Sequence, residues 1–564
     1  MSIHRHGTVV SVICMVLLCG SSAVEAVEVP QDRPSERPLQ LPESAPEQPA
    51  PVLDLPPLDL GPGTQPALPA MRVHIHDFRF TGNTAIASDE LDAVVAAYRG
   101  RELSNDDFEV IRVALTRHYI KRGFINSGAV LPDQEIKAGI ITFQIIEGRI
   151  SRIDVIGSRR LPESYVHDRV ALDAGPPVNV YAIRDRLYLL QQDPRIRRLD
   201  AALLPGTRPG EAILRIDLDE ALSQRVWFTV NNYRPPSVGA ERAEVELFDY
   251  NLLGYGDTFG LRGGVTEGSD DLDLNYAIPL NARDTALQLR YARNRSAVVE
   301  SPFDQLDVQS RSQTIGIGVW HFLHKAPQEE VGLGVTFEQR QSRSYLLGEP
   351  FAFSPGTPAN GRVRLSALRF AQSWLTHNPD RVLSARSTFS VGVDAYDPTL
   401  NSSGEPDARF LAWLGQLQWV ERLFARHDEL VTRVDTQVTD DPMLSLEQFS
   451  VGGAHSVRGY RENQLVGDNG LVASMEYRLS LWSDPGRGHR VQLAGFFDWG
   501  RSWNRERPTP EPEVLASIGA GLRATYYPWL DFELYYGSRL KKVAEQNNDL
   551  QDRGVHFQLR ARVW

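Results

Sequence analysis

The feature that most limits the fold is a repeated alternation of apolar and polar residues from about Leu222 to Trp564. Segments of about ten residues carry the pattern, and turns rich in Gly, Asp, Asn and Pro separate them. Residues 287–291 and 516–526 are clear examples. A transmembrane β-strand turns apolar side chains towards lipid and polar or small ones towards the lumen. At ~9–11 residues per strand, residues 222–564 predict an all-β transmembrane barrel of about 16 antiparallel strands.

Composition sets limits on the whole chain. A chain of 564 residues is too long to fold around one ordinary globular core, so two or more domains are expected. The formal net charge of −12 argues against nucleic acid as a partner, because phosphates require a basic face. A soluble β-rich domain such as a propeller is the alternative to a barrel.

The N-terminus has the layout of a secretory signal peptide. A short basic stretch around Arg5 precedes an apolar run over residues 9–18, and small residues follow. We predict a signal peptide over residues 1–26, removed after Ala23 or Ala26. The alternative is an uncleaved anchor helix, but the run falls short of the ~20 apolar residues that a span needs.

The two cysteines lie near the N-terminus, and a proline-rich segment follows them. Both cysteines, Cys14 and Cys19, lie in the predicted signal peptide, so the mature chain is expected to have no disulfide and no reactive thiol. Between residues 27 and 70 prolines recur every few positions, which favours extended conformations and cannot build a core. We interpret 27–70 as a semi-rigid periplasmic linker without a convincing helical pattern.

Residues 71–149 predict a small α/β unit. Apolar residues over 73–80 suggest one strand that ends at the turn Gly82-Asn83, and Ser88 is the predicted N-cap of a helix. A second helix over 108–120 ends before Gly123, and strands over 127–131 and 140–146 follow.

The same order of elements recurs over residues 150–221. A strand is predicted at 153–156, a helix at 183–192 and an alternating strand at 213–218. Two units of similar length and the order β-α-α-β-β indicate a tandem repeat.

Three blocks of residues resemble a known family. In the leading unit, the stretches 80–84, 119–124, 130–134 and 145–148 resemble a POTRA domain of the haemolysin-transporter type. The motif residues are Gly82, Asn83, Gly123, Pro132, Gln134, Glu147 and Gly148. Glycine has a physical reason at such turns, where positive φ or a tight reversal is needed. The second block, Leu204-Pro205-Gly206 with Gly210 and Leu214, resembles the end of a second POTRA domain.

The third block lies in the barrel region and is the most specific. The stretch 447–470, with Val457-Arg458-Gly459-Tyr460 at its centre, resembles a loop that folds back into the barrel lumen. Phe496-Phe497-Asp498-Trp499-Gly500 resembles the strand motif Phe-x-Asp-x-Gly. The chain therefore resembles the outer-membrane transporters of two-partner secretion, the TpsB family of ShlB/FhaC/HecB-type haemolysin secretion/activation proteins.

The resemblance implies an ion pair between Arg458 and Asp498, with Val457, Gly459 and Tyr460 completing the loop motif. On the strand, Phe496 and Gly500 complete the motif around Asp498. Arginine offers a planar fork of donors that a carboxylate accepts bidentately. The alternative is that Arg458 is one solvated loop arginine among many.

The resemblance further implies a function. An unfolded secreted exoprotein of the TpsA type would bind the POTRA domains in the periplasm and pass through the barrel to the surface of a Gram-negative bacterium. Outer-membrane lipid and the barrel-assembly machinery are further expected partners, and we expect a monomer. A general outer-membrane protein assembly factor of the same superfamily and a passive porin are the alternatives.

Catalytic motifs give no support to an enzyme. Residues 519–524 match a dinucleotide fingerprint formally, but they lie in an alternating strand with no helix after it. His455 and Ser456 are adjacent in the loop, and no third partner for a hydrolase is evident. We therefore expect no catalytic residue, no metal and no cofactor.

The C-terminus departs from the usual barrel pattern. Trp564 supplies a terminal aromatic residue, but the apolar residues from Val555 to Val563 occupy the opposite parity. A β-bulge near the end explains this, as does a weaker assembly signal.

Overall fold

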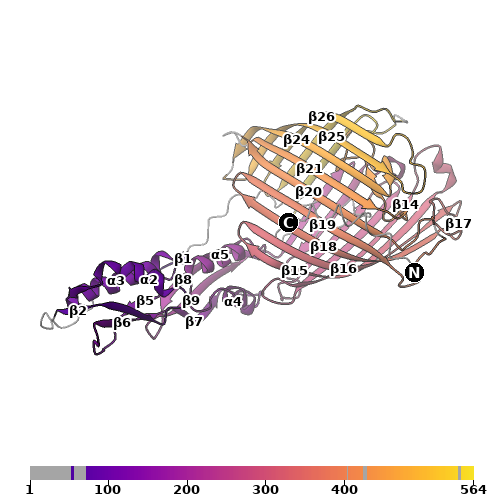
Figure 1. Ribbon diagram of the computed structural model, residues 1–564. Helices are drawn as coiled ribbons and strands as arrows, with labels where there is room; N and C mark the ends of the chain where they lie inside the picture. The colour runs from indigo at the N-terminus through magenta and orange to yellow at the C-terminus, as the bar shows by residue number, and fades with distance from the viewer. Residues whose placement is uncertain (1–52, 56–71, 403, 424–427, 485, 544–547) are drawn as a thin grey trace. The chain divides into compact units, whose positions relative to one another are not determined.

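The computed structural model describes residues 53–55, 72–402, 404–423, 428–484, 486–543 and 548–564 (Figure 1). The predicted signal peptide and nearly all of the proline-rich segment lie outside these residues. Within them, no α-helix is long and apolar enough to cross a membrane. The chain forms two compact units, of which one ends at Ala221 and the other begins at Leu222.

The first half of the α/β unit packs two helices on a three-stranded sheet of order β3-β6-β5. Its elements are β2 (Val73–Ile75), β3 (Asp77–Thr81), α2 (Ser88–Val95), a 3-10 turn (Ala96–Tyr98), β4 (Arg101–Leu103), α3 (Asn105–Lys121), β5 (Gly128–Val130) and β6 (Ile140–Ile146). Ile111, Leu115 and Tyr119 recur at helical spacing on α3 and are fully buried against the sheet.

Two local predictions for this half are wrong. The strand expected over 73–80 is two strands, because β2 leaves the main sheet and pairs with β4. Ser88 is the first residue of α2 rather than its N-cap, which is Ala87 without a side-chain cap. The Ser88 hydroxyl instead accepts a hydrogen bond from Asn83 Nδ2 at 3.1 Å. The sequence pattern predicted where the helix starts but not which residue occupies its N-cap position.

The second half has the predicted order β-α-α-β-β, which differs from the first half in having no strand between its two helices. Its elements are β7 (Arg149–Ile156), α4 (Glu163–Ala171), α5 (Val180–Gln191), β8 (Ile196–Pro205) and β9 (Glu211–Glu220). The sheet order is β1-β8-β9-β7, in which β1 (Leu53–Asp54) comes from the proline-rich segment and pairs in parallel with β8. The expectation that residues 27–70 contribute nothing to a core is therefore wrong at Leu53, which packs against the core of this half.

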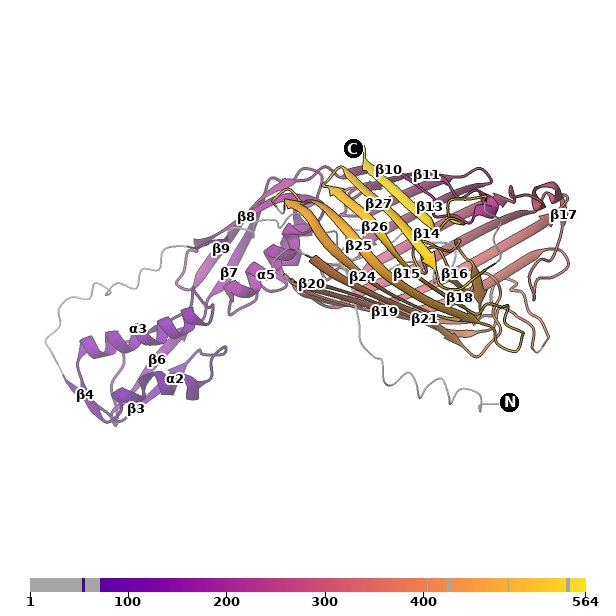
Figure 2. The same ribbon diagram turned by 90° about the horizontal axis from the view of Figure 1, so that it is seen from above.

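The second unit is a closed antiparallel barrel, which confirms the predicted fold class (Figures 1 and 2). Within the described residues its sixteen strands are β10 (Gln224–Asn231), β11 (Arg242–Asp249), β12 (Thr258–Val265), β13 (Ser269–Pro279), β14 (Ala286–Ala297), β15 (Gln309–Ala326), β16 (Glu329–Leu346), β18 (Arg362–Asn378), β19 (Arg381–Val393), β20 (Leu411–Leu423), β21 (Asp428–Thr439), β24 (Asn469–Asp484), β25 (His489–Trp503), β26 (Val514–Tyr526), β27 (Leu530–Arg539) and β28 (Val555–Arg562). Closure pairs residues 227–231 of β10 with 558–562 of β28.

Shorter elements lie in the loops between the barrel strands. They are β17 (Glu349–Pro350), a hairpin of β22 (Phe449–Val451) and β23 (Leu465–Gly467), and 3-10 turns at Pro236–Val238 and Phe303–Leu306. The β22–β23 hairpin belongs to the long connection between β21 and β24.

The period-2 pattern sorts side chains to the two faces of the barrel wall. On β26, Ile518 is 54% exposed on the outer face, whereas its neighbour Ser517 is fully buried. On β15, Ile315 and Ile317 face outward while Gly316 is buried among lumenal side chains. The alternation read from the sequence is therefore the division between an apolar outer face and a polar lumen.

The C-terminal parity is explained by a bulge. The N–H groups of Val563 and Trp564 both donate to the carbonyl oxygen of Val226, at 2.8 and 3.4 Å, and Val226 N–H donates to Trp564 at 3.0 Å. Two residues thus face one on the partner strand, which is the geometry of a β-bulge. The side chains of Val563 and Trp564 are consequently both exposed, at 64% and 62%.

Candidate functional site

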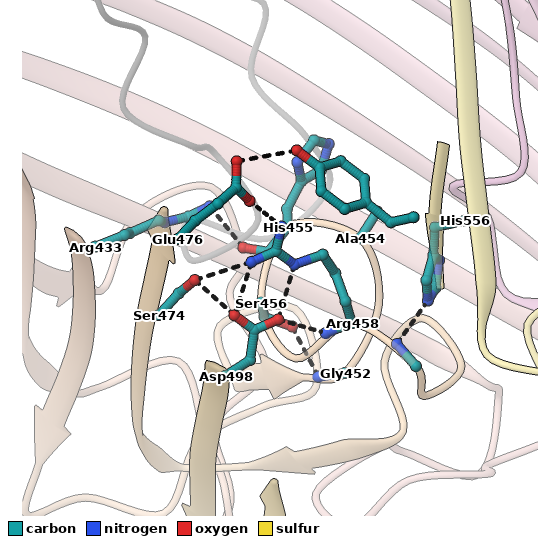
Figure 3. A network of polar contacts seen from close by, with 12 residues as sticks. Arg433, Gly452, Ala454, His455, Ser456, Arg458, Ser474, Glu476, Asp498 and His556 are labelled. Atoms are coloured by element: carbon teal, nitrogen blue, oxygen red, sulfur yellow. Dashed lines mark hydrogen bonds and ion pairs between the residues drawn. The ribbon is translucent and has the colours of Figure 1, made fainter. Parts of the chain in front are cut away.

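The candidate site is the tip of the loop between β21 and β24, residues 440–468, which folds into the barrel lumen (Figure 3). The β22–β23 hairpin forms its stem. Beyond the stem, Val457 and Tyr460 are fully buried, and Val457 packs in one apolar cluster with Val472 of β24 and Leu515 of β26. A loop of polar and glycine-rich sequence is thus held by barrel-wall side chains rather than by solvent.

Arg458 is the centre of the polar contacts at the tip. Its Nε donates to Asp498 Oδ2 at 2.8 Å and its Nη2 to Asp498 Oδ1 at 2.9 Å, a bidentate pair (Figure 3). Its Nη1 contacts Glu476, and its Nη2 lies 3.2 Å from Ser474 Oγ. The Asp498 carboxylate also accepts the backbone N–H of Arg458 at 3.0 Å, which fixes the loop main chain as well as the side chain.

The three residues of the strand motif lie on the lumenal face of β25. Phe496, Asp498 and Gly500 are two residues apart, so all three face the lumen. The Phe496 ring lies under the guanidinium, with 3.7 Å from Arg458 Cζ to the ring centroid. A Cβ at Gly500 would lie 2.5 Å from Val451 Cγ1, so glycine is needed for the loop to approach the strand. Each motif position therefore has a distinct contact with the loop.

Gly459 permits the closest approach of loop and wall. Its φ is +93°, and a Cβ there would come 2.7 Å from the carbonyl oxygen of Gly537 on β27. Its N–H donates to His556 Nε2 on β28 at 3.0 Å, and its carbonyl accepts from Arg539. The Tyr460 hydroxyl lies 2.9 Å from the Ala516 carbonyl oxygen. The tip is consequently bonded to the last three strands of the barrel as well as to β25.

A second set of contacts holds the base of the loop and was not found from the sequence. Glu447 Oε1 accepts from Arg340 Nη1 of β16 and from Arg369 Nη2 of β18, both at 2.8 Å. Arg369 Nε also donates to Glu338 at 2.7 Å. All four side chains are at most 6% exposed. The partners are 78 to 109 positions away from Glu447, so no local pattern reveals the cluster.

A third anchor lies just after the loop motif. Arg461 donates to Asp552 at 2.6 Å and to Glu300 at 2.8 and 3.0 Å. Asp552 belongs to the β27–β28 loop and Glu300 to the β14–β15 loop. Burial opposes the charge of Asp552, but the hydrogen bonds and positive charge of Arg461 outweigh it and lower the pKa of Asp552. Three separate anchors therefore fix the loop.

In the α/β unit, Glu147 gathers most of the predicted motif. Its Oε1 accepts the N–H groups of Thr84 and Ala85, both at 2.7 Å, and the Tyr119 hydroxyl at 3.0 Å. Burial opposes the charge of Glu147, but these bonds outweigh it and hold its pKa below the ordinary value. Burial and then Glu147 raise the pKa of Tyr119.

The other motif residues of this unit surround turns. A Cβ at Gly82, where φ is +78°, would lie 2.4 Å from the Ile145 carbonyl oxygen. Asn83 donates to the Ile86 carbonyl at 2.9 Å. Gly148 donates to Ser127 Oγ at 2.8 Å, and a Cβ there would overlap Asn126. At Gly123 a Cβ would overlap Asn179 and Tyr181 of the second half. These residues position turns and the junction between halves rather than forming one pocket.

Pro132 and Gln134 lie apart from that group. Gln134 Nε2 donates to the Thr142 carbonyl and its Oε1 accepts the Thr142 N–H, both at 2.8 Å. The carboxamide thus replaces a neighbouring strand along β6 beyond the end of β5. Pro132 supplies its carbonyl to Gln134 Nε2 at 3.3 Å.

Ser456 and His455, the two residues of the catalytic alternative, contact groups of the loop and of the barrel wall. Ser456 Oγ accepts the Gly452 N–H at 2.8 Å, and the His455 carbonyl accepts from Arg433 (Figure 3). Among the described residues, no group of three or more His, Cys, Asp or Glu side chains is arranged to hold a metal ion.

The comparisons with known proteins agree with this arrangement. The sequence profile described as "Haemolysin secretion/activation protein ShlB/FhaC/HecB" matches residues 210–524, and "POTRA domain, ShlB-type" matches residues 73–148. The outer membrane transporter CdiB of Escherichia coli O6:K15:H31 is 25% identical over 533 residues, covering 86% of this chain and 84% of the relative. The heme/hemopexin transporter protein HuxB of Haemophilus influenzae (strain ATCC 51907 / DSM 11121 / KW20 / Rd) is 22% identical over 481 residues, 80% of each chain.

Solved structures show the same fold. CdiB from Escherichia coli superposes with a TM-score of 0.67 at 21% identity, covering 90% of this chain and 94% of that one. BamA from Haemophilus ducreyi lacking POTRA domains 1–3 gives a TM-score of 0.53 at 15% identity, covering 87% and 100%. The family profile spans more than half of the 564 residues, over a barrel whose lumen holds the motif loop. The chain therefore belongs to the haemolysin secretion/activation protein family and is an outer-membrane transporter of two-partner secretion.

Proposed function

We propose that the α/β unit binds an unfolded secreted protein in the periplasm, and that the barrel passes this protein to the cell surface. In this proposal residues 1–26 direct export and 27–70 form a linker. Residues 71–149 and 150–221 are two POTRA domains, and 222–564 form the barrel. The chain acts as a monomer without catalytic residues, and the barrel-assembly machinery inserts it.

The observation that carries the proposal is the lumen loop. A passive porin needs no such loop, whereas here residues 440–468 enter the lumen and are fixed by buried ion pairs with side chains of four barrel strands and by a third set of pairs with two surface loops. Such a loop gives the barrel a defined internal surface that a passing chain must meet. We propose that Arg458 and Asp498 hold this loop in the conformation that permits passage.

Strand addition is the proposed mode of recognition. The edge of β8 already accepts main chain, because Leu53 and Asp54 pair with Ala201 and Ala202 in parallel register. An extended polypeptide binds such an edge through backbone hydrogen bonds, with little demand on its side chains. This suits a partner that arrives unfolded.

The direction of transport is proposed to come from folding outside the cell. The periplasm supplies no ATP, so a gain in folding free energy at the surface must bias the movement. Each ~1.4 kcal/mol of such free energy shifts the equilibrium tenfold. The proposed partner is a dedicated exoprotein, because the chain belongs to a family of secretion proteins.

Replacing Arg458 tests the role of the loop. Arg458→Ala is expected to abolish secretion while the barrel still inserts and shows normal heat-modifiable mobility on gels. The matched control is Arg553→Ala, an exposed arginine of the β27–β28 loop, which should secrete normally. Wild-type secretion by Arg458→Ala at normal protein level contradicts the proposal.

Removing the first POTRA unit tests recognition and separates the alternatives. Deletion of residues 72–148 is expected to leave channel conductance and to end export of the partner. Persistent export would contradict POTRA recognition. Loss of many other outer-membrane proteins on deletion of the whole gene would favour a general assembly role, which the fold likeness to BamA makes the second candidate.

A further inference from the structure

Four arginines from four adjacent strands lie in one row on the outer face of the barrel. Arg295 of β14 is the register partner of Arg311 on β15, Arg311 is the partner of Arg343 on β16, and Arg343 is the partner of Arg362 on β18. These strands lie side by side in the wall (Figure 1). We call these four residues the arginine row.

The arginine row points away from the lumen. On β15, Arg311 has the same parity as Ile315 and Ile317, which are 48% and 49% exposed on the outer face. Gly316, of the opposite parity, lies among lumenal side chains, where an added Cβ would meet Arg290 and Glu338. Arg295, Arg311 and Arg343 are exposed and Arg362 is half-buried. The charges therefore face the surroundings of the barrel and not the transport path.

The height of the row follows from chain direction. The barrel chain begins at Leu222, directly after the periplasmic unit, so β10 runs outward and the ends of β14 and β16 at Ala297 and Leu346 lie on the cell-surface side. Arg311 is four residues beyond Ile315, or about 13 Å along the strand. The apolar band of such barrels is ~25 Å tall. On the outer face of β15, the next residue from Ile315 towards the cell surface is the polar Gln313. On β15 the row thus lies just outside the apolar band of the outer leaflet.

One carboxylate adjoins the row at its β14 end: Asp270 of β13 is the register partner of Arg295, but its ion pair is with Arg293. Two neighbouring arginines of the same face are paired, Arg293 with Asp270 at 3.2 Å and Arg364 with Asp397. Among the residues that the structure describes, none of the four arginines of the row forms an ion pair with a carboxylate. Arg362 donates to the neutral Gln341 at 3.1 Å, and Arg311 and Arg343 flank the Tyr345 ring at 5.2 and 5.3 Å.

Such a row is unfavourable unless an anion binds it. Like charges directly opposite each other on neighbouring strands destabilise a sheet. Guanidinium groups bind phosphate bidentately and tolerate partial desolvation better than ammonium groups. A ligand that spans several strands at the headgroup level must itself carry more than one anionic group.

We propose that the arginine row binds the phosphate groups of phosphorylated glycolipid in the outer leaflet of the outer membrane. The glycolipid provides anionic groups at the height of the row, beside acyl chains that cover the apolar band below it. A secreted polypeptide emerges from the lumen, on the opposite face of the wall from the row. The ligand is therefore membrane lipid rather than the transported chain.

The proposal is tested by measuring how bisphosphorylated lipid A binds the purified full-length protein. The protein is held in nanodiscs of neutral phosphatidylcholine, and lipid A is added to them. Each basic residue near an anionic lipid surface contributes about a fivefold factor in affinity. Replacing Arg311 and Arg343 with glutamine should weaken binding by about 25-fold, and replacing all four by several hundredfold. Arginine-to-lysine replacement of all four should retain most of the affinity, because the charge remains.

The matched control removes four arginines from the periplasmic end of the barrel, two in turns and two at the strand ends beside them. The quadruple variant with glutamine at Arg283, Arg381, Arg422 and Arg487 has the same net charge as the quadruple row variant and should bind lipid A like the wild type. Dephosphorylated lipid A should bind the wild type as weakly as lipid A binds the row variant. Millimolar inorganic phosphate should not displace lipid A, since one small anion cannot span the row.

Three results would overturn the proposal. The first is equal lipid A binding by the wild type and the Arg311→Gln/Arg343→Gln variant, each shown to be folded by heat-modifiable mobility. The second is equal weakening in the periplasmic-end control, which would indicate a response to net charge alone. The third is unchanged lipid A binding by the row variant together with reduced release of the secreted partner, which would assign the row to the polypeptide.

Discussion

Replacing Glu447 with glutamine tests whether the base of the lumen loop is held by ion pairs or by apolar packing. Glu447 Oε1 accepts from Arg340 and Arg369 at 2.8 Å, and its Oε2 accepts from Arg369 at 3.1 Å. Glutamine keeps the shape but removes the anion and turns an amide N–H group towards a guanidinium. The remaining carboxylate, Glu338, bonds Arg369 at 2.7 Å and leaves Arg340 without a charged partner in the cluster.

The expected cost follows from the burial of the cluster. Two unit charges 4 Å apart interact by about 4 kcal/mol at an effective dielectric constant of ~20, and desolvation offsets part of this. Breaking one side of a buried pair costs about 3–5 kcal/mol. We take about 3 kcal/mol, because Arg340 keeps a hydrogen bond to the Leu446 carbonyl at 2.7 Å. A loss of this size raises the open population of the loop base about 100-fold.

Thiol labelling at Met443 measures that population. Met443 is 1% exposed in an apolar cluster with Val363 and Phe410 beside the loop base. Since the mature chain is expected to have no cysteine, Met443→Cys provides a single thiol that reacts only when the base opens. Glu447→Gln should label about 100-fold faster in this background. The control Glu405→Gln, an exposed carboxylate of the β19–β20 loop, should label at the parent rate.

An acceleration below about fivefold would refute the electrostatic reasoning, since it corresponds to only about 1 kcal/mol. The apolar cluster would then be the main restraint on the loop base. A double variant of Glu447 and Arg369 gives a second check. If the two residues act through one ion pair, the combined effect is smaller than the sum of the single effects.

Three further predictions concern the other contacts. Glu147→Gln should lower protection of the Thr84 amide against hydrogen exchange by about 1.5 kcal/mol at pH 7. Because the folded pKa of Glu147 is lowered, its contribution is complete above the unfolded pKa of about 4.3 and is lost as pH falls through the folded value, so the variant should lack this acid dependence. Gly537→Ala places a Cβ 2.8 Å from the Arg458 carbonyl and should displace the loop tip at a cost of about 1–3 kcal/mol, abolishing secretion while the barrel stays heat-modifiable. Arg461→Gln should accelerate the Met443→Cys labelling less than Glu447→Gln does, because Arg461 is 17% exposed and its pairs are partly screened.

The barrel and the repeated α/β order were predictable because each depends on a local period. A strand exposed to lipid on one face needs an apolar residue at every second position, and that pattern is visible over residues 516–526. The edge strand β1 was missed for the opposite reason. Leu53 and Asp54 lie in a proline-rich segment whose composition predicts no sheet, and only the free edge of β8 gives them a partner.

The Arg458–Asp498 contact was accessible only through the resemblance of its flanking motifs. The period of two explains why Phe496, Asp498 and Gly500 share a face, but not which loop residue they meet. Glu476, the second carboxylate that contacts Arg458, comes from the neighbouring strand β24 and has no motif of its own. The arginine row likewise depends on register, because a shift of one residue in one hairpin would turn one of its members into the lumen.

The three anchors of the loop also differ in what they demand of the rest of the barrel. Arg458 depends on β24 and β25, Glu447 on β16 and β18, and Arg461 on two surface loops. If the two buried anchors, at Arg458 and Glu447, each contribute about 3 kcal/mol, releasing one of them leaves roughly one molecule in a hundred open at that anchor. Simultaneous release of both is about ten-thousandfold rarer than the bound state, and release of Arg461 as well is rarer still. A loop that had to leave the lumen completely would therefore need a large external free energy. Movement at one anchor while the other two hold needs far less, so we infer that any rearrangement during transport proceeds one anchor at a time.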